Sequence, residues 1–204
     1  MSSPKSAYSI PTKKGKLDTH IFVVWVDNES GVLARVVGLF SGRGYNIESL
    51  AVAEVDAAKN ISRITIVTTG TPQVIDQIKL QLKKLVPVHK VADFKREDKK
   101  VIFKEMALLK IVAQKKKIEK CLKECKKFNP VILDKTNKSV VVQITALRRE
   151  IDKMSKKLKP YGLTSTSRTG AIAMTRGADT FKSIYKGEEK NEDVLWKRCW
   201  CKLN

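Results

Sequence analysis

Asn28 and Gly31 lie in a short polar turn, residues 27–31, directly after an apolar run of strand length. Gly31 stands where the next helix should begin, and the unpaired backbone N–H groups of a helix N-terminus attract an anion such as a carboxylate. Glycine also lets a ligand approach the backbone closely, and the Asn28 amide can both donate to and accept from a zwitterion. The turn is therefore a candidate site for the carboxylate of a small ligand.

A simpler interpretation of the same turn needs no ligand. Asn28 and Ser30 are both residue types that cap helices. Gly44, Tyr45 and Asn46 can likewise form only the turn that leads into the next strand. Taken by themselves, these residues favour this simpler interpretation.

The cysteines lack the spacing of a common zinc site. Cys121 and Cys125 lie four residues apart, Cys199 and Cys201 form C-x-C, and both histidines are distant from either pair. Cys121 and Cys125 also share a helical face with Ile118, which is typical of buried core thiols. We expect no metal site in this chain.

The motifs of a self-contained active site are missing from the sequence. It contains no Walker loop, G-x-G-x-x-G turn, G-x-S-x-G elbow or H-E-x-x-H pair. Neither of its two histidines stands beside a candidate nucleophile. We expect no catalytic residues and no cofactor in the chain itself.

The net charge of +20 lies mainly in the second half of the chain. Residues 101–204 carry 25 basic and 11 acidic side chains, a net of +14. Such a field attracts nucleic acid, an anionic membrane or an acidic protein surface. Lysine outnumbers arginine by 32 to 9 and aromatic residues make up only 6%, which argues against base recognition and stacking. A lysine-rich solvated surface is the favoured interpretation, and nucleic-acid binding is the less favoured one.

Hydrophobic periodicity in the first half alternates between strand and helix. Residues 20–26 form a continuous apolar run, as in a strand buried on both faces. Thr71 and Pro72 are good residues for the cap and first position of a helix. The expected elements are strand 20–26, helix 33–40, strand 45–55, strand 61–69, helix 72–85 and strand 86–94.

The second half repeats this order after a charged link at residues 95–100. The expected elements are strand 102–113, helix 118–128, a hairpin of strands 131–133 and 140–144, helix 147–158, and one closing strand that runs to about Met174. The order predicts an α+β chain of two tandem ferredoxin-like βαββαβ domains. In each domain the helices should cover one face of an antiparallel sheet, which leaves the other face to pair with something else.

We assign the domains as 20–97 and 98–177, between a flexible basic tail at 1–19 and an unassigned extension at 178–204. The tail lacks a convincing amphipathic helix, so a transit peptide is the less favoured interpretation. No apolar run is long enough for a membrane span or a signal peptide. We expect a soluble protein without a membrane partner, in a plastid or mitochondrion of a eukaryote or in the cytoplasm of a bacterium.

Several ordered motifs resemble the regulatory small subunits of acetolactate synthase. The segment 27–50, DNESGVLARVVGLFSGRGYNIESL, resembles the ACT domain of that family, and 61–66 resembles its third strand. EMALLK at 105–110 looks like the opening strand of the family's C-terminal domain. Pro-Tyr-Gly at 160–162 and the segment from Arg168 to Arg176 look like its closing strand. The resemblance covers about residues 20–177 and is strongest in the first third.

The resemblance implies an effector site between the ACT domains of two subunits. A branched-chain amino acid, usually valine, would bind to Asn28 and Gly31 of one subunit and to Asn46 and Ile47 of the other. It also implies a second group of residues, which are possible contacts for the catalytic subunit or participants in its activation: Arg168, Thr169, Gly170 and Arg176.

The function implied by the resemblance is regulation of a separate enzyme. The chain would form a homodimer, activate the catalytic subunit of acetolactate synthase and confer feedback inhibition on it. Thiamine diphosphate, Mg²⁺ and FAD would be bound by that catalytic partner. The alternative is an ACT-type subunit recruited as a structural component of an organellar ribonucleoprotein or other large assembly, which the excess of basic residues motivates.

Overall fold

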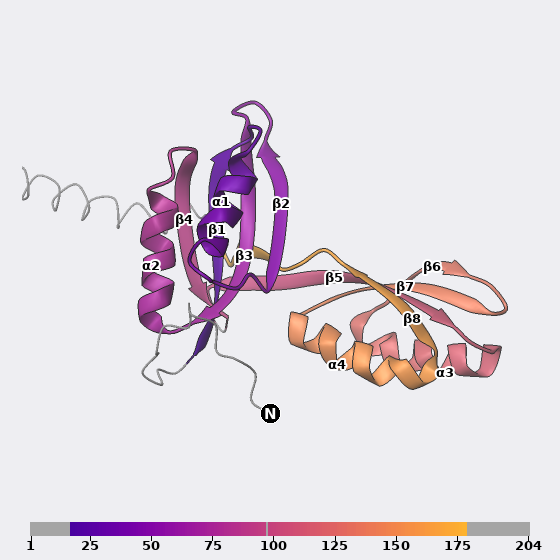
Figure 1. Ribbon diagram of the computed structural model, residues 1–204. Coiled ribbons are helices and arrows are strands. Elements are labelled where there is room, and N and C mark those ends of the chain that lie inside the picture. The colour runs from indigo at the N-terminus through magenta and orange to yellow at the C-terminus, as the bar shows by residue number, and fades with distance from the viewer. Residues whose placement is uncertain (1–16, 97, 179–204) are drawn as a thin grey trace, which may run out of the picture.

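The computed structural model describes residues 17–96 and 98–178, which form two sheets with a pair of helices on one face of each (Figure 1). The first unit consists of β1 (Asp18–Asp27), α1 (Val32–Ser41), β2 (Ser49–Asp56), β3 (Ile61–Gly70), α2 (Pro72–Lys83) and β4 (Val88–Lys95). The second consists of β5 (Val101–Val112), α3 (Lys115–Cys125), β6 (Val131–Lys135), β7 (Ser139–Ala146), α4 (Arg148–Leu158), β8 (Leu163–Arg168) and β9 (Ile172–Thr175). The repeated α+β plan is confirmed.

The first sheet is antiparallel with the strand order β2-β3-β1-β4. β1 is central and is buried on both faces, as its continuous apolar run predicted. Phe22 and Val24 face the helices, whereas Ile21 and Val23 belong to a second core on the opposite face. β2 is an edge strand of this sheet.

Helices α1 and α2 cover the inner face of the first sheet. Thr71 caps α2 as predicted, since its side-chain oxygen accepts from the Val74 N–H, and Pro72 begins the helix. α1 ends at Ser41, immediately before Gly42. The side chains that these helices bury include Val36, Leu39, Phe40, Ile75, Ile78 and Leu82.

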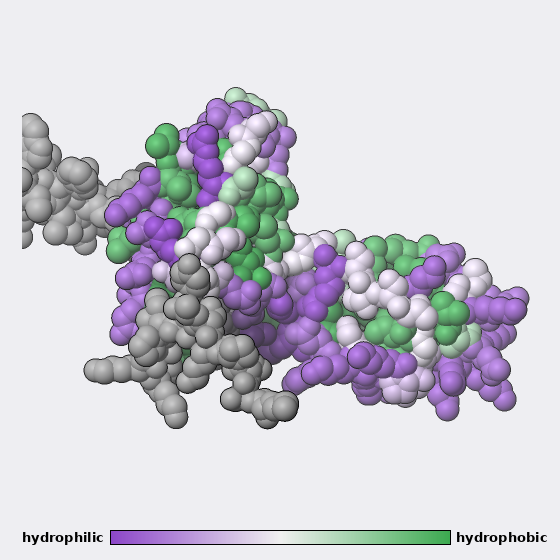
Figure 2. Space-filling model, in the orientation of Figure 1, coloured by the Kyte–Doolittle hydropathy of each residue, from purple (hydrophilic) through white to green (hydrophobic). Residues whose placement is uncertain are grey.

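The second sheet has the order β6-β7-β5-β8, and α3 and α4 pack on one face of it. The outward side of these two helices is largely hydrophilic (Figure 2). Cys121 and Cys125 are both fully buried in this core, which confirms their prediction as core thiols. Two short 3-10 turns, Lys126–Phe128 and Lys159–Tyr161, extend the two helices.

The single closing strand expected to run to Met174 is instead two strands. β8 pairs with residues 107–111 of β5, and β9 pairs with residues 101–104 of the same strand. Gly170, at φ +82, lies between β8 and β9 in a left-handed conformation that favours glycine. After this interruption β9 lies beside the first residues of β5, next to the first unit.

The outer face of the first sheet is covered by the chain itself. A third core joins Ile21, Val23 and Phe94 of that sheet to Phe103 of β5 and Ala173 of β9. β5 therefore serves both units: its first residues pack on the first sheet and its remainder is a strand of the second (Figure 1). The regions 20–97 and 98–177 share a core instead of meeting only through a linker.

Among the helices of the described ranges, none combines the length and the apolar character that crossing a bilayer requires. Of the tail assigned to 1–19, only residues 17–19 are described. Of the extension assigned to 178–204, only residue 178 is described.

Candidate functional site

The N-terminus of α1 has no side-chain cap. Gly31 is the N-cap residue, at φ 83 and ψ −10, and neither Asn28 nor Ser30 caps the helix. The first turn of the helix carries no acidic residue that would occupy its amide groups. The interpretation in which Asn28 and Ser30 only cap α1 is therefore wrong, because neither side chain accepts from the amide groups at this end. The Val32 N–H donates to the Glu29 carbonyl at 3.4 Å, and no side chain occupies the other amide groups of the first turn.

Asn28 is held so that its amide nitrogen can donate to a ligand. Its Oδ1 accepts a hydrogen bond of 2.9 Å from the Ser62 hydroxyl, and its backbone N–H donates to the Asn60 carbonyl at 2.7 Å. The amide nitrogen has no partner within the described part of the chain. Around Gly31, apart from Gly31 and its two neighbours in the chain, no atom of the described residues lies within 4 Å of the position that a Cβ would occupy. A small carboxylate thus has room beside a fixed donor.

Asn46 and Ile47 lie at the other end of the same sheet. They precede β2, where the Thr68 hydroxyl donates to the Asn46 carbonyl at 2.7 Å and Ile47 packs on the first core. β2 and β1 are both antiparallel to β3 and hence run in the same direction. The start of β2 aligns with Ile21 of β1, six residues or roughly 20 Å from Asp27. One chain therefore does not bring Asn46 and Ile47 to Asn28 and Gly31.

Arg168 forms an internal ion-pair cluster. Its guanidinium donates to the Glu105 carboxylate at 2.7 and 2.8 Å and to Asp152 at 2.6 Å. The hydrogen bonds to Glu105 raise the pKa of Arg168, and the Glu105 side chain is only 3% exposed. Arg168 thus ties β8 to β5 and α4.

Thr169 and Gly170 lie where β8 gives way to β9, against the first unit. The Thr169 hydroxyl accepts from the Met106 N–H at 3.2 Å. Gly170 lies so close to the start of β2 that a Cβ there would be 2.8 Å from Ser49 Oγ and 3.1 Å from the Leu50 carbonyl oxygen. These two residues are committed to contacts within the chain.

Two further hydrogen bonds join the start of β2 to the second unit. The Ala171 N–H donates to Ser49 Oγ at 3.1 Å, and the Arg148 guanidinium donates to the Glu48 carbonyl at 3.0 Å. Together with Gly170, these residues form what we call the β2 joint: Glu48, Ser49, Arg148, Gly170 and Ala171. The sequence analysis missed Glu48, Ser49 and Arg148 as members of any site. No motif or regular spacing in the sequence identifies these residues, because the two hydrogen bonds join residues that lie 100 and 122 positions apart.

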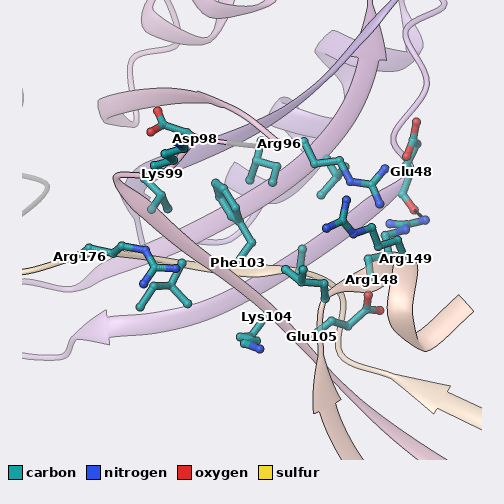
Figure 3. Close-up of a pocket in the computed structure, with 16 residues that line it drawn as sticks. Glu48, Arg96, Asp98, Lys99, Phe103, Lys104, Glu105, Arg148, Arg149 and Arg176 are labelled. Atoms are coloured by element: carbon teal, nitrogen blue, oxygen red, sulfur yellow. Dashed lines mark hydrogen bonds between the residues drawn. The ribbon is translucent and has the colours of Figure 1, made fainter. Parts of the chain in front are cut away.

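A cavity of about 560 Å³ opens beside the β2 joint, between the two units (Figure 3). Arg176 lines it, whereas Arg168, Thr169 and Gly170 do not. The charged residues in its wall are Glu48, Arg96, Asp98, Lys99, Lys104, Glu105, Arg148, Arg149 and Arg176. The described residues contain no cluster of three or more histidine, cysteine, aspartate or glutamate side chains suited to a metal ion.

Two family models match the chain in succession. Residues 22–90 match the AHAS small subunit-like ACT domain, and residues 104–177 match the model described as the small subunit of acetolactate synthase. The two matches correspond to the two units of the fold.

Relatives from distant organisms match the same region. The acetolactate synthase small subunit of Aquifex aeolicus is 36% identical over 165 residues, which span 80% of this chain and 84% of the relative. The probable acetolactate synthase small subunit of Methanothermobacter thermautotrophicus is 35% identical over 164 residues, which span 80% of this chain and 96% of the relative. The crystal structure of the small subunit from Thermotoga maritima superimposes with a TM-score of 0.71 at 30% identity, and the match covers 79% of this chain and 99% of that one. These likenesses confirm the resemblance found in the sequence and do not favour a structural component of a ribonucleoprotein.

Proposed function

Because the chain belongs to the family of acetolactate synthase small subunits, a family of regulatory subunits, we propose that it activates a catalytic subunit and makes it sensitive to feedback inhibition by a branched-chain amino acid. The observation that carries the proposal is the uncapped α1 N-terminus at Gly31, beside the fixed amide of Asn28. A zwitterionic amino acid offers both the carboxylate for the helix terminus and an ammonium group for carbonyl acceptors.

The effector site requires a second copy of the chain. β2 is an edge strand, and its unpaired backbone groups can pair with another strand. If two copies pair their β2 strands antiparallel about a two-fold axis, the start of one β2 lies beside the end of the other. Asn46 and Ile47 of the partner then come to the end of the sheet where Asn28 and Gly31 lie. This arrangement supports homodimerisation through the first unit, with two equivalent effector sites.

The catalytic partner would supply the chemistry. We expect it to hold thiamine diphosphate, Mg²⁺ and FAD, whereas this chain would contribute positioning and regulation alone. The β2 joint gives the effector site a physical connection to the second unit, because Glu48 and Ser49 directly follow Asn46 and Ile47. Arg168, Thr169, Gly170 and Arg176 would then affect activation through the placement of the second unit as well as through any direct contact.

Calorimetric titration and reconstitution test the proposal. The purified chain should bind valine, leucine or isoleucine and show no pyruvate-condensing activity. Added to its catalytic subunit, it should raise turnover, and the amino acid that binds should lower that turnover again. Absence of binding of all three amino acids at millimolar concentration would exclude the effector site, and an unchanged rate of the catalytic subunit would exclude activation.

A further inference from the structure

The cavity between the two units is far from neutral. Six of the residues that line it are basic and three are acidic. Each acidic side chain already has a partner in the chain. Glu105 is paired with Arg168, Asp98 accepts from the Lys100 N–H at 2.8 Å, and Glu48 accepts from the Thr69 hydroxyl at 2.5 Å.

Four of the six basic side chains in the wall have no such partner within the described residues: Arg96, Lys99, Lys104 and Arg176. Neither the Arg96 nor the Arg176 guanidinium has an ion pair or a side-chain hydrogen bond within the described residues. Like charges that line one cavity repel each other, and a bound anion reduces that repulsion. The cavity is therefore electrostatically suited to an anionic ligand.

Most of the basic side chains lie at two ends of the cavity. Arg96, Arg148 and Arg149 lie at one end beside Glu48, and Lys99 and Arg176 lie at the other, where Asp98 is next to Lys99 (Figure 3). Lys104 lies between the two ends (Figure 3). Phe103 lies between the two groups (Figure 3). The remaining lining is largely apolar and comprises Ile21, Val67, Val101, Ile102, Leu147 and Ala171.

We propose that this cavity binds a small organic dianion whose two negative groups are separated by an apolar body. Its volume of about 560 Å³ lies within the roughly 300–1,000 Å³ usual for small-molecule sites, which occur preferentially at domain interfaces. A guanidinium forms paired hydrogen bonds to a carboxylate, and each end of the cavity offers at least one. Because Glu48 and Arg148 line the cavity and also belong to the β2 joint, the ligand contacts both units at their connection. This site is separate from the amino-acid site at Asn28 and Gly31.

A homologous series of probes tests the proposal on the full chain alone. Straight-chain dicarboxylates from four to twelve carbons are titrated by calorimetry at constant ionic strength, beside the monocarboxylate of each length. Affinity should pass through a maximum at an intermediate length, and the best dicarboxylate should bind at least tenfold more tightly than its matched monocarboxylate. Affinity that is equal for the two kinds of probe, or that only rises with chain length, overturns the proposal.

Variants at the two ends of the cavity distinguish binding at this site from nonspecific attraction of an anion to a basic protein. Arg96→Ala and Arg176→Ala should each reduce the affinity for the best dicarboxylate to that of its monocarboxylate. Lys135→Ala, at the exposed end of β6, removes the same charge far from the cavity and should leave the affinity within twofold of wild type. Equal losses in all three variants overturn the proposal. Unchanged melting temperatures show that the variants remain folded, and valine titration in the same samples reports on the amino-acid site independently.

Discussion

At Asn28 a single side chain connects the effector turn to the third strand. Asn28→Ala removes a hydrogen bond to a charged ligand, which is typically worth about 1.5–3 kcal/mol, or roughly 10- to 150-fold in the dissociation constant for valine. Gly31→Asp should weaken binding further, since it places a like charge at the helix terminus and forces a side chain onto a backbone at φ 83. Both variants should still activate the catalytic subunit but lose inhibition by valine. Calorimetry and inhibition curves of the reconstituted enzyme provide the measurements.

Ser62→Ala is the matched control for Asn28. It removes the hydroxyl that orients the Asn28 amide but leaves the amide in place. The loss of valine affinity should therefore be smaller than in Asn28→Ala. An equal loss in both variants would mean that Asn28 acts only by supporting the turn.

The two buried thiols of α3 should be protected from alkylation. Cys121 and Cys125 have no exposed surface. Their mutual hydrogen bond raises the pKa of the Cys121 thiol and lowers the pKa of the Cys125 thiol, so it is burial that protects the pair from a reagent. Iodoacetamide should therefore modify neither residue in the native protein and both after unfolding. Peptide mapping by mass spectrometry distinguishes these two thiols from the others. Native labelling of Cys121 at the rate of a free thiol would contradict this structure of the second core.

Among the secondary-structure elements, Arg168 is the main polar link between β5, β8 and α4. Arg168→Ala leaves the Glu105 carboxylate buried without its guanidinium partner, which should lower the free energy of unfolding by about 2–4 kcal/mol. Lys157→Ala breaks an exposed pair with Glu124 and should cost far less, because solvent screens the attraction between exposed charges. Urea unfolding of both variants checks the difference. Similar losses in the free energy of unfolding would show that the Arg168–Glu105 pair contributes no more to stability than an exposed pair.

The β2 joint allows the connection between the two units to be tested with two glycines. Gly170 and Gly177 both have positive φ values, of +82 and +67, so alanine strains the backbone at either position. At Gly170 alone the new Cβ would also collide with Ser49 and Leu50, because around Gly177 no described atom lies within 4 Å. Gly170→Ala should keep valine binding within about threefold but lose most of the inhibition by valine, since an effector inhibits only if its binding is converted into a change elsewhere in the complex.

Gly177→Ala should retain both valine binding and inhibition. The measurements are calorimetric titration of valine and inhibition curves of the enzyme reconstituted with each variant. If valine inhibits the enzyme reconstituted with Gly170→Ala as fully as the enzyme reconstituted with Gly177→Ala, the β2 joint does not transmit the effector signal.

For the whole molecule, the proposed effector site predicts a dimer, because Asn28 and Asn46 lie at opposite ends of the first sheet of one chain. Homodimers of Asn28→Ala or of Asn46→Ala should each have two weakened sites. A heterodimer purified with two different tags should have one site with both native residues and one site with neither. Titration with valine should therefore recover one site of wild-type affinity per heterodimer.

If the heterodimer has no site of wild-type affinity for valine, Asn28 and Asn46 do not share a site across the two-fold axis. Light scattering provides the accompanying test of assembly. A monomer at micromolar concentration would exclude the proposed dimer altogether.

The local elements and the repeated plan could be predicted from the amino-acid sequence. The apolar run of β1 and the capping pair Thr71 and Pro72 act over a few residues, so their effects can be read without knowledge of the fold. The same holds for the helical spacing that buries Cys121 and Cys125. The motif around Asn28 and Gly31 identified the candidate effector turn, although it could not show whether side chains capped the helix.

The way in which the two units are joined could be seen only in the tertiary structure. The division of the closing strand at Gly170, the shared core around Phe103 and the contact of Arg148 with Glu48 all depend on residues distant in sequence. It also separated Asn46 from Asn28, because the direction of β2 is fixed by its pairing with β3 and not by its own residues. Strand pairing and interdomain packing are long-range interactions, and a local pattern of residue types contains no information about which distant partner each residue meets.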